Sequence, residues 1–103
     1  MTRADDIKTP IHPGEILKAD FLGPMGISAY RLAKDINVQQ TRVSKILKGE
    51  RRITADTALR LAKYFGMEPE FWMNLQKRYE LETAHDDLDT RIEREVKTFA
   101  KAE

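Results

Sequence analysis

Apolar residues recur along this chain at intervals of three and four, the spacing of one face of an α-helix. Short groups of glycine, proline and capping residues interrupt the recurrence, and no stretch sustains the period of two that a β-strand requires. The pattern therefore predicts an all-α fold of five packed helices with an additional C-terminal helix. The expected helices lie near residues 13–23, 29–36, 39–48, 55–65, 69–81 and 86–102.

The ends of these helices carry residues suited to capping. His12, Ser28 and Thr54 stand at three of the predicted starts. Side chains of this kind accept a hydrogen bond from a free backbone N–H in the first turn. Asn37 and Gly66 follow two of the predicted helices and tolerate the left-handed conformation that ends a helix.

Charge is unevenly distributed, although the net charge is only +1. Residues 38–52 contain five cations and one anion, whereas residues 80–103 contain eight anions and four cations. This asymmetry predicts two surfaces with different partners. The alternative for either cluster is an ordinary solvated helix face.

Residues 39–48 separate into two faces when they are placed on a helix. Val43, Ile46 and Leu47 form a narrow apolar face. The opposite side exposes amide, hydroxyl and ammonium groups, which belong to Gln40, Thr41, Ser44, Lys45 and Lys48. Such groups can hydrogen-bond base edges in the major groove of double-stranded DNA. A capped helix and a short turn come directly before, so the two helices are predicted to form a helix-turn-helix unit.

Residues 28–76 resemble the helix-turn-helix module of phage-repressor-like (XRE) transcription regulators. Two flanking motifs, "HPGEILK" at 12–18 and "PEFWMNLQKRYEL" at 69–81, are similar to those of HigA-type antitoxins. The resemblance implies a homodimer that binds a palindromic operator in its own promoter. It also implies that the protein neutralises a HigB-type toxin, a RelE-like enzyme that cleaves mRNA. The alternative is a stand-alone regulator without a toxin.

The resemblance also assigns roles to individual residues. The base-reading positions fall on Gln40, Thr41, Ser44 and Lys45, with Gln39 as a further candidate. The phosphate-binding positions fall on Ser28, Lys48, Arg51 and Arg52, with Arg42 as a further candidate. The helix-turn-helix domain is expected to occupy residues 1–84, with a short N-terminal arm, and an acidic helix is expected at 85–103.

Aromatic and apolar residues in the fifth helix have the spacing of a core or a dimer seam, with a ligand pocket as the less favoured alternative. They are Phe71, Trp72, Leu75 and Tyr79. The last predicted helix has a stripe of apolar positions, for which three roles are open. The stripe packs back on its own domain, pairs with the same helix of a second copy, or binds a toxin. These positions are Leu88, Ile92, Val96 and Phe99.

Other classes of function find little support in the sequence. The chain has no cysteine and only two histidines, far apart, so we expect no metal site and no cofactor. No nucleophile–base pair or phosphate-binding loop suggests an enzyme. No apolar run approaches the roughly 20 residues of a membrane span. We therefore expect a cytoplasmic protein, associated with the bacterial nucleoid when it is bound to its operator.

Overall fold

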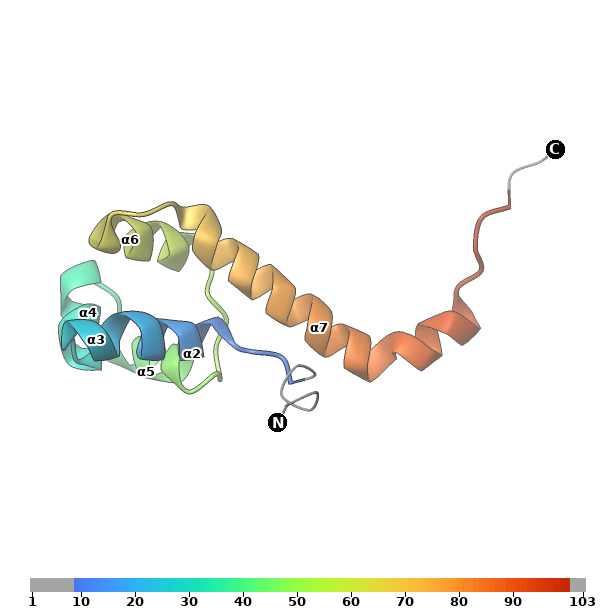
Figure 1. Ribbon diagram of the computed structural model, residues 1–103, viewed down its shortest axis with the longest axis horizontal. Coiled ribbons are helices and arrows are strands. Elements are labelled where there is room, and N and C mark those ends of the chain that lie inside the picture. The colour runs from blue at the N-terminus through green and yellow to red at the C-terminus, as the bar shows by residue number, and fades with distance from the viewer. Residues whose placement is uncertain (1–8, 101–103) are drawn as a thin grey trace.

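The computed structural model describes residues 9–100, and this part of the chain is helical without a β-strand (Figure 1). This confirms the predicted all-α class. In chain order the elements are α2 (Pro13–Ile16), η1 (Leu17–Leu22), α3 (Gly23–Met25), α4 (Ala29–Ile36), α5 (Gln40–Leu47), α6 (Ala55–Phe65) and α7 (Pro69–Glu95).

The first three elements form one helix that contains a π-helical segment. The sequence indicates Gly23, Pro24 and Gly26 as the residues that end it, and the helix runs to Met25 and ends at Gly26, which is left-handed with φ 65°. Proline inside a helix lacks an N–H, and its ring crowds the carbonyl four residues earlier. Pro24 is tolerated here because a wider turn comes directly before it, in which the N–H of Gly23 bonds the Lys18 carbonyl.

The predicted helix ends are confirmed where capping chemistry indicated them. The side chains of His12, Ser28 and Thr54 accept backbone N–H groups two or three residues later, at 2.8, 3.0 and 3.3 Å. Asn37 and Gly66 adopt left-handed conformations, with φ 58° and 68°. Each of these ends includes a bonding group or a left-handed residue that its own sequence provides, so the position of the end could be predicted locally.

The core combines side chains from every helix and from the segment between α5 and α6. Its buried members are Leu17, Leu22, Leu32, Ala33, Ile36, Val43, Ile46, Ile53, Ala58, Leu61 and Trp72. The start of α2 packs so closely on the end of α5 that a Cβ atom at Gly14 would collide with the Ile46 carbonyl oxygen. This packing ties the N-terminal helix to the helix with the predicted base readers.

The prediction of a separate C-terminal helix is wrong. Residues 82–87 continue the helix instead of interrupting it, so the fifth and sixth predicted helices form the single helix α7. The segment contains neither glycine nor proline, and ion pairs four residues apart, such as Arg78–Glu82 and Arg91–Glu95, run along its surface. The helix ends at Glu95, and Val96 is extended, so Phe99 does not share a helical face with Leu88.

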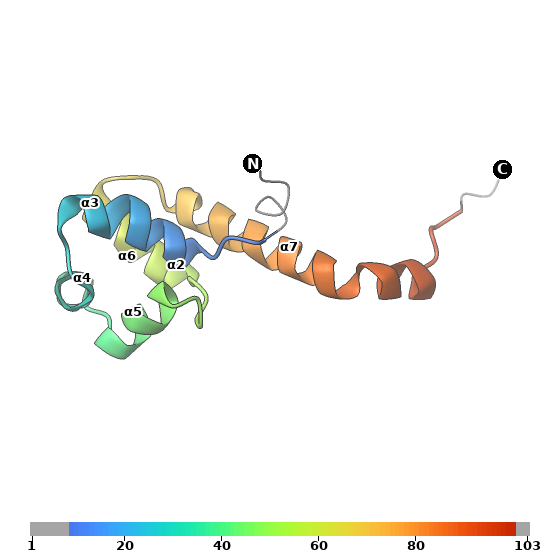
Figure 2. The same ribbon diagram turned by 60° about the horizontal axis from the view of Figure 1, so that its bottom comes forward.

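The distal half of α7 leaves the domain, as both views of the chain show (Figure 1, Figure 2). Every described side chain from residue 84 onward is exposed. The radius of gyration is 17.4 Å, whereas a compact chain of this length would have about 13 Å. Folding back of this segment on its own domain, one of the predicted alternatives, is therefore not observed.

None of the helices between residues 9 and 100 combines the length and the hydropathy needed to cross a membrane.

Candidate nucleic-acid interface

Helices α4 and α5 pack against each other and are joined by the three residues 37–39 (Figure 2). The left-handed Asn37 turns the chain, and its N–H reaches back to the Lys34 carbonyl at 3.3 Å. Asparagine adopts this conformation more readily than other residues with a Cβ, because its short polar side chain bonds locally. The two helices therefore form the predicted helix-turn-helix unit.

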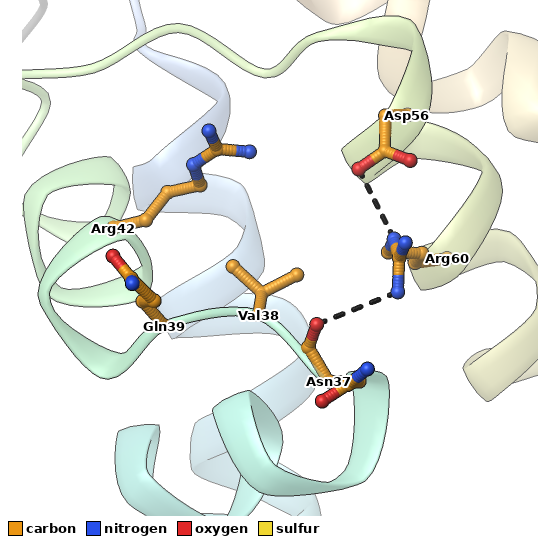
Figure 3. A pocket seen from close by; sticks show the side chains of 6 residues that line it. All are labelled: Asn37, Val38, Gln39, Arg42, Asp56 and Arg60. Carbon is orange, nitrogen blue, oxygen red and sulfur yellow. Dashed lines mark hydrogen bonds and ion pairs between the residues drawn. The ribbon is translucent and has the colours of Figure 1, made fainter.

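Arg60 of α6 holds this turn from outside the unit (Figure 3). Its Nη1 donates to the carbonyls of Ile36 at 3.0 Å and Asn37 at 3.4 Å, and its Nε donates to Asp56 at 3.0 Å. The guanidinium thus satisfies carbonyls that the end of α4 leaves without helical partners. Together with Val38, Gln39 and Arg42, these side chains line a shallow pocket at the start of α5.

The two faces of α5 are those that the sequence indicates. Val43 and Ile46 are buried, and Leu47 is half-buried against the core. The predicted base readers Gln40, Thr41 and Lys45 are exposed, and Ser44 is half-buried. Gln39 occupies the N-cap position but makes no side-chain cap bond. Its amide is therefore not needed for the helix end, and the face offers amide, hydroxyl and ammonium groups together.

The predicted phosphate-binding residues lie in three places. Ser28 begins α4, where its hydroxyl oxygen accepts the Arg31 N–H and its own O–H remains a donor. Arg42 is half-buried and lines the pocket beside the turn. The end of α5 exposes Lys48, its C-cap residue. Gly49 then turns the chain with φ 78°, and the loop that follows exposes Arg51 and Arg52.

Arg52 has a partner that sequence reasoning missed. Its Nε donates to Glu80 of α7 at 2.8 Å, and Gln76 Nε2 donates to the same carboxylate oxygen at 2.9 Å. Together these two hydrogen bonds lower the pKa of Glu80, with Arg52 as the larger cause. The buried amide of Gln76 also binds the chain segment that follows Arg52. No spacing signal predicts this network, because Arg52 and Glu80 are 28 residues apart.

The four residues expected at a core or dimer seam have different environments. Trp72 is fully buried, with its ring 5.0 Å from that of Phe21, and its indole N–H has no partner among the described residues. Leu75 packs partly on the core, and the ring of Tyr79 meets His12 edge-on at 4.8 Å. Phe71 is 38% exposed and remains available to a partner.

The histidine and the three aspartates at 85–89 are exposed on α7. His85 lies 3.5 Å from Asp89, one helical turn away, and both side chains are exposed. Within residues 9–100 no group of three or more histidine or acidic side chains is placed to hold a metal.

Two packed helices, a short turn, a polar exposed face and a cationic loop define a helix-turn-helix DNA-binding domain. A family model described as "Helix-turn-helix" matches residues 17–72. Virulence-associated protein I of Dichelobacter nodosus is 51% identical over 77 residues, which are 75% of this chain and 71% of that protein.

Two solved structures extend the comparison to the whole fold. An addiction-module antidote protein of the HigA family from Coxiella burnetii is 50% identical, with a TM-score of 0.83, covering 87% of this chain and 98% of that one. The Pseudomonas aeruginosa antitoxin HigA, solved with the higBA promoter, is 43% identical, with a TM-score of 0.86, covering 88% and 99%. This chain belongs to the helix-turn-helix family, in the branch of the HigA antitoxins.

Proposed function

We propose that this protein is a sequence-specific repressor that binds a palindromic operator in its own promoter and serves as the antitoxin of a HigB/HigA-type pair. The observation that carries the DNA-binding proposal is the exposed polar face of α5, held on a helix-turn-helix unit that Arg60 braces. Glutamine, threonine and lysine side chains match the donor and acceptor pattern of base edges in the major groove.

The proposed base readers are Gln39, Gln40, Thr41, Ser44 and Lys45. Ser28, Arg42, Lys48, Arg51 and Arg52 are the candidates for phosphate contacts, which set orientation and make binding salt-dependent. The exposure of the first turn of α5 supports this assignment, since that end of a recognition helix enters the groove.

The direct test replaces Gln40 by alanine and measures binding to the protein's own promoter and to random DNA. We expect affinity for the promoter to fall by about 1–3 kcal/mol, with a relaxed preference at one base pair, because a bidentate amide–adenine interaction is removed. Asn74→Ala, an exposed amide on α7, is the matched control and should bind as the wild type does. Equal weakening on both DNAs would reject Gln40 as a base reader.

The antitoxin part of the proposal rests on membership in the HigA branch and on the acidic surface of α7. An RNA-cleaving toxin is expected to be basic, and charge complementarity would speed and orient its binding. Purification from the native host should recover a small basic protein in equal amount. Purification of this chain alone, from cells that express its neighbouring genes, would instead support a stand-alone regulator.

Repression through a palindrome requires two copies of the domain. We propose a homodimer whose two α5 helices enter successive major grooves about 34–36 Å apart. The protein would act in the bacterial cytoplasm and be associated with the nucleoid when it is bound to its operator.

A further inference from the structure

Residues 49–53 lie between α5 and α6. The N–H groups of Gly49 and Glu50 still bond carbonyls of α5. Side chains from two distant elements contact the segment as well. The N–H of Ile53 donates to Gln76 Oε1 of α7 at 2.8 Å. The imidazole of His12, the cap of α2, lies against the same segment: a Cβ atom at Gly49 would stand 3.6 Å from its ring, and the Arg51 carbonyl is near enough to act on its pKa. The segment is therefore contacted from two sides of the domain, at Ile53 by a hydrogen bond with α7 and at Gly49 by the ring of His12.

Both of these side chains are buried, His12 to 5% exposure and Gln76 to 2%. Burying a polar group costs free energy unless its hydrogen bonds are satisfied. Gln76 uses both ends of its amide, since its Nε2 donates to Glu80. His12 uses its Nδ1 as the α2 cap, and the backbone of Gly49 packs on its ring. An apolar side chain would fill either position without this cost, but it would leave the segment unattached.

The two arginines of this segment differ in what they contact. The Nε of Arg52 is bound by Glu80, so its side chain is directed toward α7. Arg51 is exposed, and within residues 9–100 it forms no ion pair. The segment thus offers one arginine to the solvent while the other attaches the chain to α7.

We infer that His12 and Gln76 are positioning residues for operator binding, which hold residues 49–53 so that Arg51 meets a DNA phosphate while Arg52 attaches the segment to Glu80. This inference rests on the proposed DNA-binding function. Of the two arginines in this segment that were candidates for phosphate contacts, it assigns the contact to Arg51 and not to Arg52. Holding the backbone in advance removes the entropy cost of ordering it when DNA binds.

The salt dependence of operator binding separates the two arginines. Arg51→Ala should reduce the slope of log K against log salt by about 0.9 for each phosphate that the protein no longer neutralises. Arg52→Ala should leave that slope unchanged and lower the melting temperature. A reduced slope for Arg52→Ala would overturn the assignment of Arg52 as an attachment point.

The positioning role is tested by Gln76→Met, which keeps the side-chain length but removes both hydrogen bonds. It should reduce the salt slope as Arg51→Ala does, and the double variant should bind no more weakly than Arg51→Ala alone, because both changes act on the same phosphate. His12→Asn is the second variant. Asparagine retains the cap of α2 but lacks the ring that packs against Gly49, so the slope should fall although α2 stays capped.

Thr57→Val is the matched control, since Thr57 is as buried as Gln76, and its side chain and N–H are hydrogen-bonded to Thr54, the cap of α6, instead of to residues 49–53. It should lower the melting temperature with no change in salt slope and with additive behaviour toward Arg51→Ala. If Gln76→Met and His12→Asn behave as Thr57→Val does, the positioning role is wrong, although DNA binding stands. Failure of the wild-type protein to bind its own promoter at low salt would reject the proposed function itself, and the inference with it.

Discussion

At the scale of single residues, the cap formed by His12 requires a neutral imidazole. Its Nδ1 accepts the N–H of Gly14, so the ring proton resides on Nε2, and the ring packs edge-on against Tyr79. Burial lowers the pKa of His12, while the hydrogen bond to the Arg51 carbonyl and the charge of Glu15 act in the opposite direction. Protonation would place a proton on Nδ1 and remove the cap.

This lowered pKa predicts that stability depends on pH through His12. Because the folded pKa lies below the unfolded value of about 6.5, the contribution is complete above pH 6.5 and is lost as the pH falls toward the folded pKa. Urea unfolding between pH 7.5 and 5 should show this decline in the wild type but not in His12→Asn. His85→Gln is the control and should retain the decline; a His12→Asn protein with the same slope would contradict the assignment.

Gly14 supplies a second residue-scale prediction. Alanine at this position would force the Ile46 carbonyl away from α2, so we expect Gly14→Ala to destabilise the protein by about 1–3 kcal/mol. The measurement is the free energy of unfolding in urea, with Ala19→Gly, an exposed position in the same helix, as the comparison. A neutral Gly14→Ala would mean that α2 and α5 separate at little cost.

At the scale of elements, the geometry of the helix-turn-helix unit depends on α6 as well as on its own two helices. Arg60 reaches across to the end of α4, and Tyr64 of the same helix donates to Asp35 at 2.6 Å. The hydrogen bond from Tyr64 lowers the pKa of Asp35, and Arg31 adds to this effect. The relative placement of α4 and α5 is thus stabilised by polar interactions with a third helix.

We expect Arg60→Lys to weaken operator binding more than binding to random DNA. Lysine keeps the charge, but it cannot bond Asp56 and two carbonyls in the fixed directions of a guanidinium. Arg78→Lys is the matched control, since Arg78 forms a similar pair with Glu82 on α7 at 3.2 Å. Fluorescence anisotropy with the two DNAs gives the specificity ratio, and equal ratios for both variants would contradict the bracing role.

At the scale of the whole molecule, the notable feature is the length of α7. Its 27 residues span about 40 Å, of which only the first half contributes to the core. From its middle onward the helix exposes apolar side chains, among them Leu81, Leu88 and Ile92, at 64%, 37% and 48%. Apolar groups that are aligned along one helix are stabilised when a second helix covers them.

We expect this stripe to contribute to the proposed homodimer. Replacing Leu88 and Ile92 together by serine should shift the sedimentation coefficient toward that of a monomer, while helix content near the core and the fluorescence of Trp72 stay unchanged. The control is a variant with Asp87→Ser and Arg94→Ser, which replaces two charged side chains of the same segment by serine. This variant should remain a dimer. A double apolar variant that remains dimeric would exclude this stripe from the dimer interface.

The sequence alone determined those features that depend on residues within a few positions of one another. The caps at His12, Ser28 and Thr54 and the left-handed Asn37 were predictable, because each involves a local backbone bond. The division of residues 39–48 into a buried and an exposed face followed from helical periodicity. The exception was the boundary at 82–87, where acidic residues that suit a helix start proved equally suited to continuing one.

The tertiary structure alone decided which side chains brace the predicted DNA-binding surface. Arg60 and Ile36 are 24 residues apart, Gln76 and Ile53 are 23, and Arg52 and Glu80 are 28. No periodicity relates such positions, since their meeting depends on how α6 and α7 are placed around the core. For the same reason the count of charges in the sequence could not distinguish Arg51 from Arg52. In the structure the two differ, because Arg52 forms an ion pair with Glu80 of α7.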